Sequence, residues 1–148
     1  NMPADLQVGL RYQHRFHVPA SKTVPALYPE AEEFAQMPQV FATGFMVGFL
    51  EWACIKAINP YLDWPSEQSV GTHINVSHQA ATPVGAEVVA DVELIQIEGR
   101  RLVFAVTAHD GWDVIAQGTH ERFLIDKQRF ETKLAQKQQQ LPERADHL

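Results

Sequence analysis

The sequence has a single cysteine among its 148 residues, Cys54, so the chain cannot form an internal disulfide bond. It lacks an uninterrupted apolar run of the roughly 20 residues that a membrane-spanning helix requires. No charged and then apolar leader precedes the first strand-like segment, and nothing therefore signals secretion. We expect a cytoplasmic protein, and we interpret Asn1, which stands before Met2, as a residue left by tag removal.

Positive charge is also scarce. The sequence has 12 lysines and arginines against 18 aspartates and glutamates, which gives a formal net charge of −6. An acidic surface does not attract phosphate backbones or anionic lipids, so we expect neither nucleic acid nor membrane as a partner. A small ligand that carries phosphate would need only a local basic cluster.

Motifs for metals and for phosphate loops are absent as well. His14 and His17 fall on opposite faces of a predicted strand, as do His73 and His78, and no cysteine lies at zinc-site spacing from a histidine. No glycine-rich loop could cradle a phosphate. The sequence therefore predicts no bound metal and no cofactor.

Apolar residues, in contrast, are plentiful enough for one core. They make up 45% of the chain, and the length fits a single domain over residues 2–148 that needs no disulfide or metal to fold. The longest apolar stretch predicts a buried helix over about residues 43–58, in which Glu51 and Lys56 are the only polar side chains after residue 44. Thr43 is the predicted N-cap, and Pro60 disfavours helical geometry in the residue before it, which stops the helix.

The carboxylate of Glu51 lies on a particular stripe of this helix. Gly44, Gly48 and Glu51 follow one another at helical spacings of four and three, and the two glycines permit close approach of a strand or a ligand. A charge on a buried helix requires a partner or a function.

Segments of alternating polarity predict a sheet around this helix. A first strand is expected over residues 7–18, and the proline-rich residues 19–39 read as a loop or lid. Four further strands are predicted over residues 69–81, 87–97, 102–109 and 114–125, followed by an exposed helix from residue 126 and a tail to residue 148. A curled antiparallel sheet that surrounds one helix is an α+β arrangement, the hot-dog fold. Such folds usually pair into dimers, in which the partner covers the remaining helix face.

Three residues are candidates for chemistry. Glu51 is either a structural acceptor or a general base or nucleophile at an acyl carbon. The even positions of the predicted strand over residues 69–81 are mainly apolar, so His78 is expected to face the core. It is either a core histidine with satisfied hydrogen bonds or the catalytic neighbour of Glu51. Thr43 caps the helix, and its hydroxyl with the free N–H groups there also suits a developing oxyanion.

Two other groups are weaker candidates. Cys54 lies in the buried helix without a cationic neighbour in sequence and reads as a small core residue. Arg100, Arg101 and Arg122 could meet phosphates, although arginines at turns and strand ends are more often solvated surface residues.

Several motifs resemble those of the fluoroacetyl-CoA thioesterase family of hot-dog proteins. The most specific are VFATGFMVG at residues 40–48 and EWAC at residues 51–54. Further matches lie at residues 22–24, 27–30, 71–72, 76–78, 80–83, 98–101, 108–111 and 118–122. The resemblance covers almost the whole chain outside its two ends.

The resemblance implies hydrolysis of a short acyl-CoA. The family's catalytic threonine, glutamate and histidine match Thr43, Glu51 and His78, and a glycine amide that matches Gly71 helps to bind the thioester carbonyl. In that assignment Glu51 attacks the carbonyl or activates water, His78 handles the proton, and Thr43 orients or polarises the acyl group. Arg122 is included as a candidate substrate contact.

One departure from the family concerns the lid. The fluoroacetyl-specific enzyme has a second lid phenylalanine, after the one that matches Phe34, where this chain has Met37. A flexible thioether closes a pocket less rigidly than an aromatic ring. We therefore expect a short-chain acyl-CoA thioesterase, acting on halogenated, otherwise substituted or plain acyl groups, without strong fluorine selectivity.

Two alternatives remain at this point. A hot-dog acyl-CoA hydratase or dehydratase also uses a carboxylate and a histidine, but those families place them close together in sequence, unlike Glu51 and His78. The second alternative is a non-catalytic protein that binds and sequesters acyl-CoA.

Overall fold

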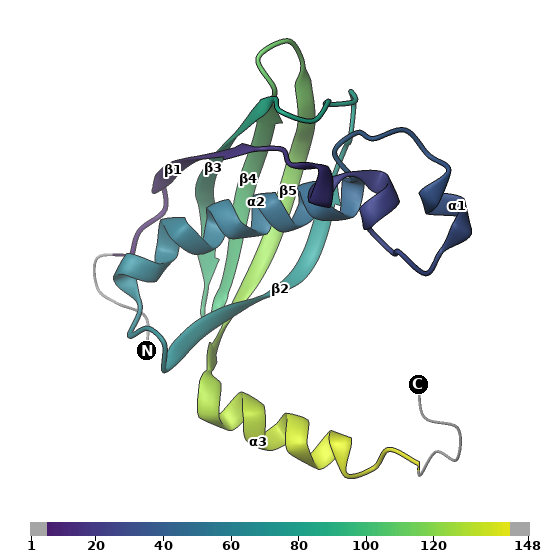
Figure 1. Ribbon diagram of the computed structural model, residues 1–148. Coiled ribbons are helices and arrows are strands. Elements are labelled where there is room, and N and C mark those ends of the chain that lie inside the picture. Colours follow the sequence, from purple (N-terminus) through teal and green to yellow (C-terminus); the bar gives the residue numbers. More distant parts are fainter. Residues whose placement is uncertain (1–5, 143–148) are drawn as a thin grey trace.

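The computed structural model describes residues 6–142, so Asn1 and the end of the predicted tail lie outside the described residues. Its main feature is a five-stranded antiparallel sheet that curls around one long helix, α2 (Figure 1). The strands are β1 (Arg11–His17), β2 (Glu67–Val76), β3 (Glu87–Glu98), β4 (Arg101–His109) and β5 (Val114–Asp126). They lie in the order β1-β3-β4-β5-β2. The predicted arrangement of one sheet around one helix is confirmed.

The helix α2 spans Thr43–Ile58, as predicted. Its N-cap is Ala42, however, and no side chain caps the first turn, so the prediction that Thr43 is the N-cap is wrong. Thr43 is instead the first helical residue, which leaves its hydroxyl available for another partner. The shorter helices are η1 (Ala20–Lys22), η2 (Val24–Ala26), α1 (Glu32–Ala35), η3 (Asn59–Tyr61) and α3 (Lys127–Gln138).

One side of α2 forms the centre of the core. Met46, Leu50 and Ala53 are fully buried against the sheet, where they pack with side chains such as Leu94 and Phe104. Burial of a side chain the size of leucine contributes about 2 kcal/mol to stability. The helix is therefore held in place mainly by the removal of apolar surface from water.

The opposite side of α2 is not covered within one chain. Gly44, Gly48 and Lys56 are exposed, and Trp52 keeps 45% of its surface. The prediction that the helix is buried nearly all round thus holds for one side only, because the sheet of a single copy wraps only that side. The stripe of Gly44, Gly48 and Glu51 belongs to the uncovered side.

β2 contains a bulge that changes which side chains face α2. The pairing with β5 shifts between Gly71 and His73, so Thr72 is an extra residue. Directly paired residues in antiparallel strands share a face of the sheet. Before the bulge, Ser69 pairs with the buried Leu124, whereas Val70 pairs with the exposed Phe123.

The predicted alternation in this strand is therefore correct only after the bulge. Ile74 pairs with the buried His120 and faces inward, but Val70 faces outward, and Ser69 and Gly71 take the inward positions. The strand also ends at Val76 rather than at residue 81, so His78 lies in the irregular segment that follows.

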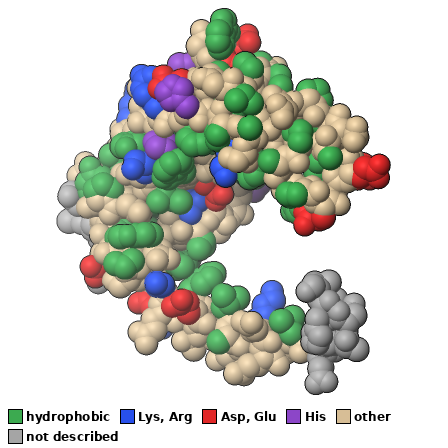
Figure 2. Space-filling view, viewed as in Figure 1, with side chains coloured by type: hydrophobic (Ala, Val, Ile, Leu, Met, Phe, Trp, Pro, Cys, Tyr) green, Lys and Arg blue, Asp and Glu red, His purple; other side chains and the backbone are tan. Residues whose placement is uncertain are grey.

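The outer edge of β2 is open, because β2 is the last strand in the order of the sheet. Residues 71–75 are all exposed. On the same side, Figure 2 shows the molecule hollowed between the lid, residues 19–39, and α3. An open strand edge is a surface on which another strand can pair.

Within residues 6–142, no helix has the length and apolar character needed to cross a membrane. The cytoplasmic location stays a prediction.

Candidate active site

Thr43 and His78 form one half of the candidate site. The Thr43 hydroxyl Oγ1 lies 2.7 Å from His78 Nδ1, a hydrogen-bond distance. The other ring nitrogen of His78, Nε2, is buried and has no hydrogen-bond partner among the described residues. Burial lowers the pKa of His78 below its ordinary value of 6.5, although a hydrogen bond with the Ala80 backbone raises it in part.

This pair sits at the N-terminus of α2, which has its own electrostatic character. The first N–H groups of a helix lack intrahelical partners, and the helix dipole places partial positive charge there. A neutral imidazole, a hydroxyl and these N–H groups can together exchange a proton and stabilise negative charge on an oxygen. The arrangement suits addition to a carbonyl group.

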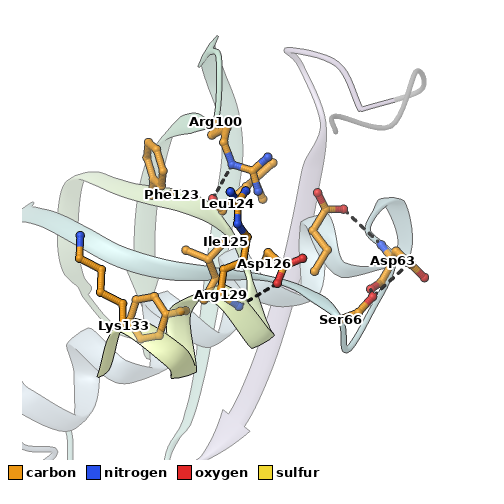
Figure 3. A pocket seen from close by; sticks show the side chains of 11 residues that line it. Asp63, Ser66, Arg100, Phe123, Leu124, Ile125, Asp126, Arg129 and Lys133 are labelled. Atoms are coloured by element: carbon orange, nitrogen blue, oxygen red, sulfur yellow. Dashed lines mark hydrogen bonds between the residues drawn. The ribbon is translucent and has the colours of Figure 1, made fainter. Parts of the chain in front are cut away.

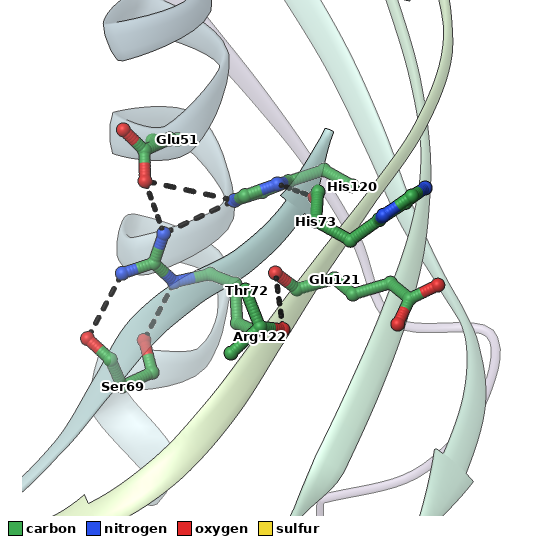
Figure 4. Close-up of polar contacts among 7 residues, drawn as sticks. All are labelled: Glu51, Ser69, Thr72, His73, His120, Glu121 and Arg122. Atoms are coloured by element: carbon green, nitrogen blue, oxygen red, sulfur yellow. Dashed lines mark hydrogen bonds and ion pairs between the residues drawn. The ribbon is translucent and has the colours of Figure 1, made fainter. Parts of the chain in front are cut away.

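Glu51, Arg122 and His120 form the second half, shown in Figure 4. Arg122 Nη1 donates a hydrogen bond to Glu51 Oε2 at 2.9 Å and also lies 3.1 Å from His120 Nε2. Glu51 comes from α2, whereas the other two residues come from β5 and are inward-facing neighbours on that strand. The Glu51 side chain is 37% exposed, so the carboxylate is paired on one oxygen and still accessible.

Ser69 completes the anchoring of Arg122. Arg122 Nε donates to Ser69 Oγ at 2.7 Å, and Nη2 donates to the Ser69 carbonyl at 2.9 Å. Arg122 is only 3% exposed. The expectation that it resembles a solvated surface arginine is wrong, because the sheet places it inside and its three nitrogens bind protein groups.

Gly71 lies directly against the Glu51 carboxylate. A Cβ atom added to Gly71 would meet Glu51 Oε2 at 2.5 Å and Arg122 Nη1 at 3.3 Å. Its backbone is not in the left-handed region, so space and not conformation demands glycine here. The bulge that turns Gly71 inward therefore lets β2 approach the carboxylate.

The predicted catalytic residues form two groups rather than one within a single chain. Thr43 contacts His78, whereas Glu51 contacts Arg122 and His120. Glu51 follows Thr43 by eight positions in the helix, which corresponds to about 12 Å along the axis. Within one chain, no hydrogen bond or ion pair among the described residues joins the two groups.

The predicted lid contacts, Phe34 and Met37, come from the segment that precedes α2. Phe34 stacks on Tyr28 with ring centroids 6.1 Å apart, and Met37 is 47% exposed. Both belong to the protruding segment around α1, which Figure 1 shows beyond the N-terminal end of α2. Their role as substrate contacts stays a prediction.

His120 is a residue of the site that the sequence analysis did not single out. The sequence did contain a signal for it, since His120, Arg122 and Leu124 alternate along β5 and all face inward.

Cys54 is buried, as expected. Burial raises the pKa of its thiol to about 12, a shift that Arg122 reduces and Glu51 adds to. A thiol with such a pKa is not a nucleophile near neutral pH.

A separate cavity of about 700 Å³ lies between α3 and the end of β5 (Figure 3). Its lining includes Arg100, Arg129 and Lys133, but also Asp63 and Asp126. The cavity contains none of the candidate catalytic residues.

Among the described residues, no group of three or more His, Cys, Asp and Glu side chains could hold a metal ion.

Comparison with known proteins places this geometry in context. The family model described as fluoroacetyl-CoA-specific thioesterase matches residues 25–128. The fluoroacetyl-CoA thioesterase of Streptantibioticus cattleyicolor is 54% identical over 136 residues, which are 92% of this chain and 97% of that protein.

Solved structures give the same result. A variant of the fluoroacetyl-CoA enzyme FlK in complex with acetyl-CoA is 55% identical, with a TM-score of 0.87 over 89% of this chain and 98% of that chain. A thioesterase superfamily member from Thermus thermophilus is 25% identical, with a TM-score of 0.80 over 92% of this chain and 96% of that chain. The predicted hot-dog fold is confirmed.

Proposed function

The chain belongs to the fluoroacetyl-CoA thioesterase family, and we propose that it hydrolyses a short-chain acyl-CoA to the free acid and CoA. The acyl group is small and includes plain as well as halogenated or otherwise substituted forms. The observation that carries this proposal is the contact of Thr43 with His78 at the N-terminus of α2. It combines a proton acceptor, a hydroxyl and helix N–H groups where a carbonyl oxygen can accept hydrogen bonds.

In the proposed reaction, water supplies the oxygen that bonds to the acyl carbon, and the carbon–sulfur bond breaks. Glu51 either adds to the carbonyl carbon itself, to be released by water, or removes the proton from the attacking water. Thr43 and the helix N-terminus hold the carbonyl oxygen as it becomes negative. The proton released by the attacking water passes through neutral His78 to the sulfur, so CoA departs as a thiol and the acyl group leaves as the free acid. The reaction requires no cofactor beyond the CoA of the substrate.

We further propose that a second copy of the chain completes each site. The open edge of β2 and one side of α2 are both uncovered in a single chain, which supports a two-fold dimer that buries both. If two β2 strands pair in antiparallel fashion, the His78 end of one lies beside the Ser69 end of the other. Thr43 and His78 of one copy would then work with Glu51 of its partner.

Mixed dimers test this arrangement. Thr43→Ala and Glu51→Gln chains should each be inactive, but refolding them together should restore about a quarter of the wild-type activity, because half of the dimers would hold one intact site. If the three residues act within one chain, every mixed site has one defect and activity stays absent. Light scattering of the wild type supplies the oligomeric state, and a monomer would contradict the dimer.

The acyl preference depends on the lid. Met37 stands where the fluoroacetyl-specific enzyme has a phenylalanine, and its exposed thioether supports a pocket that closes loosely. We expect acetyl-CoA and fluoroacetyl-CoA to have kcat/KM values within about a hundredfold of each other, and Met37→Phe to raise the preference for fluoroacetyl-CoA. A wild-type preference for fluoroacetyl-CoA of several orders of magnitude would refute the loose pocket.

A panel of short acyl-CoAs with a free-thiol reagent distinguishes this function from its alternatives. Thiol release supports hydrolysis, loss of the double bond of an enoyl-CoA supports a hydratase, and binding without either change supports a sequestering protein. Glu51→Gln should fold, as judged by circular dichroism, yet lose at least about a thousandfold in kcat. Unchanged turnover in this variant would remove Glu51 from the mechanism.

A further inference from the structure

The hydrogen bonds of His120 fix which of its ring nitrogens carries the proton. Nδ1 lies 2.7 Å from the carbonyl oxygen of His73, across the bulge of β2. A carbonyl oxygen only accepts hydrogen bonds, so Nδ1 must carry a proton and donate. His120 is only 2% exposed, and this burial lowers its pKa. The hydrogen bond with the His73 carbonyl raises the pKa by a smaller amount. The ring is therefore neutral, and Nε2 offers a lone pair.

That lone pair has a specific donor. Arg122 Nη1 lies 3.1 Å from His120 Nε2 and 2.9 Å from Glu51 Oε2, so its two N–H groups divide between the imidazole and the carboxylate. His120 Nε2 and Glu51 Oε2 lie 3.9 Å apart and are both acceptors. The Arg122 guanidinium donates to both and so holds them near each other. His120 does not neutralise Glu51, since only Arg122 carries a positive charge here.

The opposite tautomer would break this pattern. With the proton on Nε2, the ring N–H would oppose the N–H of Arg122 Nη1 at 3.1 Å, leave that N–H without an acceptor, and turn an unprotonated Nδ1 toward the His73 carbonyl. Buried polar groups left without hydrogen-bond partners destabilise the folded chain. The structure therefore favours one tautomer, and that tautomer sets the direction of the Arg122 guanidinium.

We propose that His120 is a positioning residue for Glu51, which acts by holding Arg122 Nη1 between its own Nε2 and the Glu51 carboxylate. The proposal rests on the thioesterase function proposed above. The chain of contacts runs from the His73 carbonyl through His120 and Arg122 to Glu51 Oε2. It links the bulge of an edge strand to the orientation of a carboxylate on the helix, while Oε1 has no partner among the described residues and stays available for chemistry.

Two substitutions separate the two ends of the imidazole. His120→Gln can place an amide oxygen near the position of Nε2 and accept from Arg122, whereas His120→Asn reaches only the position of Nδ1. We expect His120→Asn to lower kcat by about 10-fold to 100-fold with KM within about threefold, and His120→Gln to recover most of that loss. The same two substitutions at the exposed His17 serve as matched controls with unchanged activity.

The result that overturns the proposal is equally specific. If His120→Asn folds and keeps the wild-type kcat, or if the Asn and Gln variants lose kcat to the same extent, Nε2 does not act through Arg122. Circular dichroism and thermal melts show whether loss of activity merely follows loss of folded protein.

A measurement on the wild-type protein covers the case in which the variants fail to fold. With histidine labelled with 15N, NMR should show His120 protonated on Nδ1 and unprotonated on Nε2 at pH 7. A proton on Nε2 would overturn the proposal whatever the kinetics. If the wild type releases no thiol from any acyl-CoA of the panel, the proposed function fails, and the NMR result still decides whether the contacts of His120 are as described.

Discussion

The Thr43 side chain shows how one residue can change its role between sequence and structure. A threonine before an apolar helix predicts an N-cap. Here Ala42 is the N-cap and Thr43 is the first helical residue, so its hydroxyl contacts His78 instead. The first-turn N–H groups of α2 therefore lack a side-chain cap. Groups left free in this way are available for a ligand oxygen.

Removal of this hydroxyl tests that interpretation. Thr43→Ala should lower kcat by about 100-fold or more, whereas Thr43→Ser keeps the hydroxyl and should stay within about tenfold of the wild type. Because Thr43 does not cap the helix, Thr43→Ala should cost little stability, and its thermal midpoint should match that of Thr43→Ser within a few degrees. A large drop in the midpoint for the alanine variant would indicate a structural hydroxyl.

The protonation of His78 gives a prediction for the pH dependence of activity. Burial lowers the pKa of His78 below 6.5, so the neutral form that accepts protons persists to lower pH than in free histidine. We expect kcat to be nearly constant from about pH 8 down to 6.5 and to fall only below that pH. A profile of kcat against pH at saturating acyl-CoA measures this, and half-loss of activity above pH 6.5 would contradict it.

At the scale of elements, the bulge in β2 decides which residues reach the helix. Without the extra residue Thr72, the alternation would turn Gly71 outward and Val70 inward. With the bulge, a glycine meets the Glu51 carboxylate at a distance that leaves no room for a side chain. Bulges often occur near functional sites because they redirect side chains in this way.

Gly71→Ala should therefore displace the carboxylate. The added methyl group would contact Glu51 Oε2 at 2.5 Å, so Glu51 or β2 must move, and we expect kcat to fall by about 100-fold. Thr72→Ala, at the adjacent exposed residue, is the matched control and should change kcat by less than about threefold. Equal kcat values for the two variants would show that the space at Gly71 has no part in the reaction.

At the scale of the whole molecule, three histidines lose solvent on folding: His120 is buried, and His14 and His78 are half-buried. Burial lowers the pKa of His14, with Lys56 adding to the shift, and burial also lowers the pKa values of His78 and His120. In the unfolded chain these residues return to about 6.5 and take up protons first as the pH falls. Acid therefore favours the unfolded chain.

The free energy of unfolding should accordingly be highest above pH 6.5 and decrease as the pH falls below it. Each histidine contributes at most about 1.4 kcal/mol per pH unit. Urea unfolding at a series of pH values between about 5 and 8 measures the slope, and His120→Gln should make it shallower. A protein that becomes more stable on acidification across this range would contradict the lowered pKa values of these histidines.

Much of this protein is determined by local sequence. The range of α2 follows from its apolar run and the proline after it, and the strands follow from alternation, so the hot-dog arrangement could be predicted. Glu51, His78 and Thr43 were identified as candidates because charge, imidazole and hydroxyl groups are unusual in such positions. These signals depend on residues close together in the chain.

The tertiary structure alone decided which side chains meet. The partners of Glu51 come from β5, 71 positions away for Arg122, and depend on the register between β5 and β2, which a one-residue bulge shifts. No periodicity reveals that shift in advance, because alternation assumes an unbroken ladder. Thus the sequence determined that a carboxylate lies on the central helix. Only the packing of strands that are distant in the chain decided that Arg122 and His120 hold this carboxylate. The physical reason is that direct contact and burial determine which charges interact.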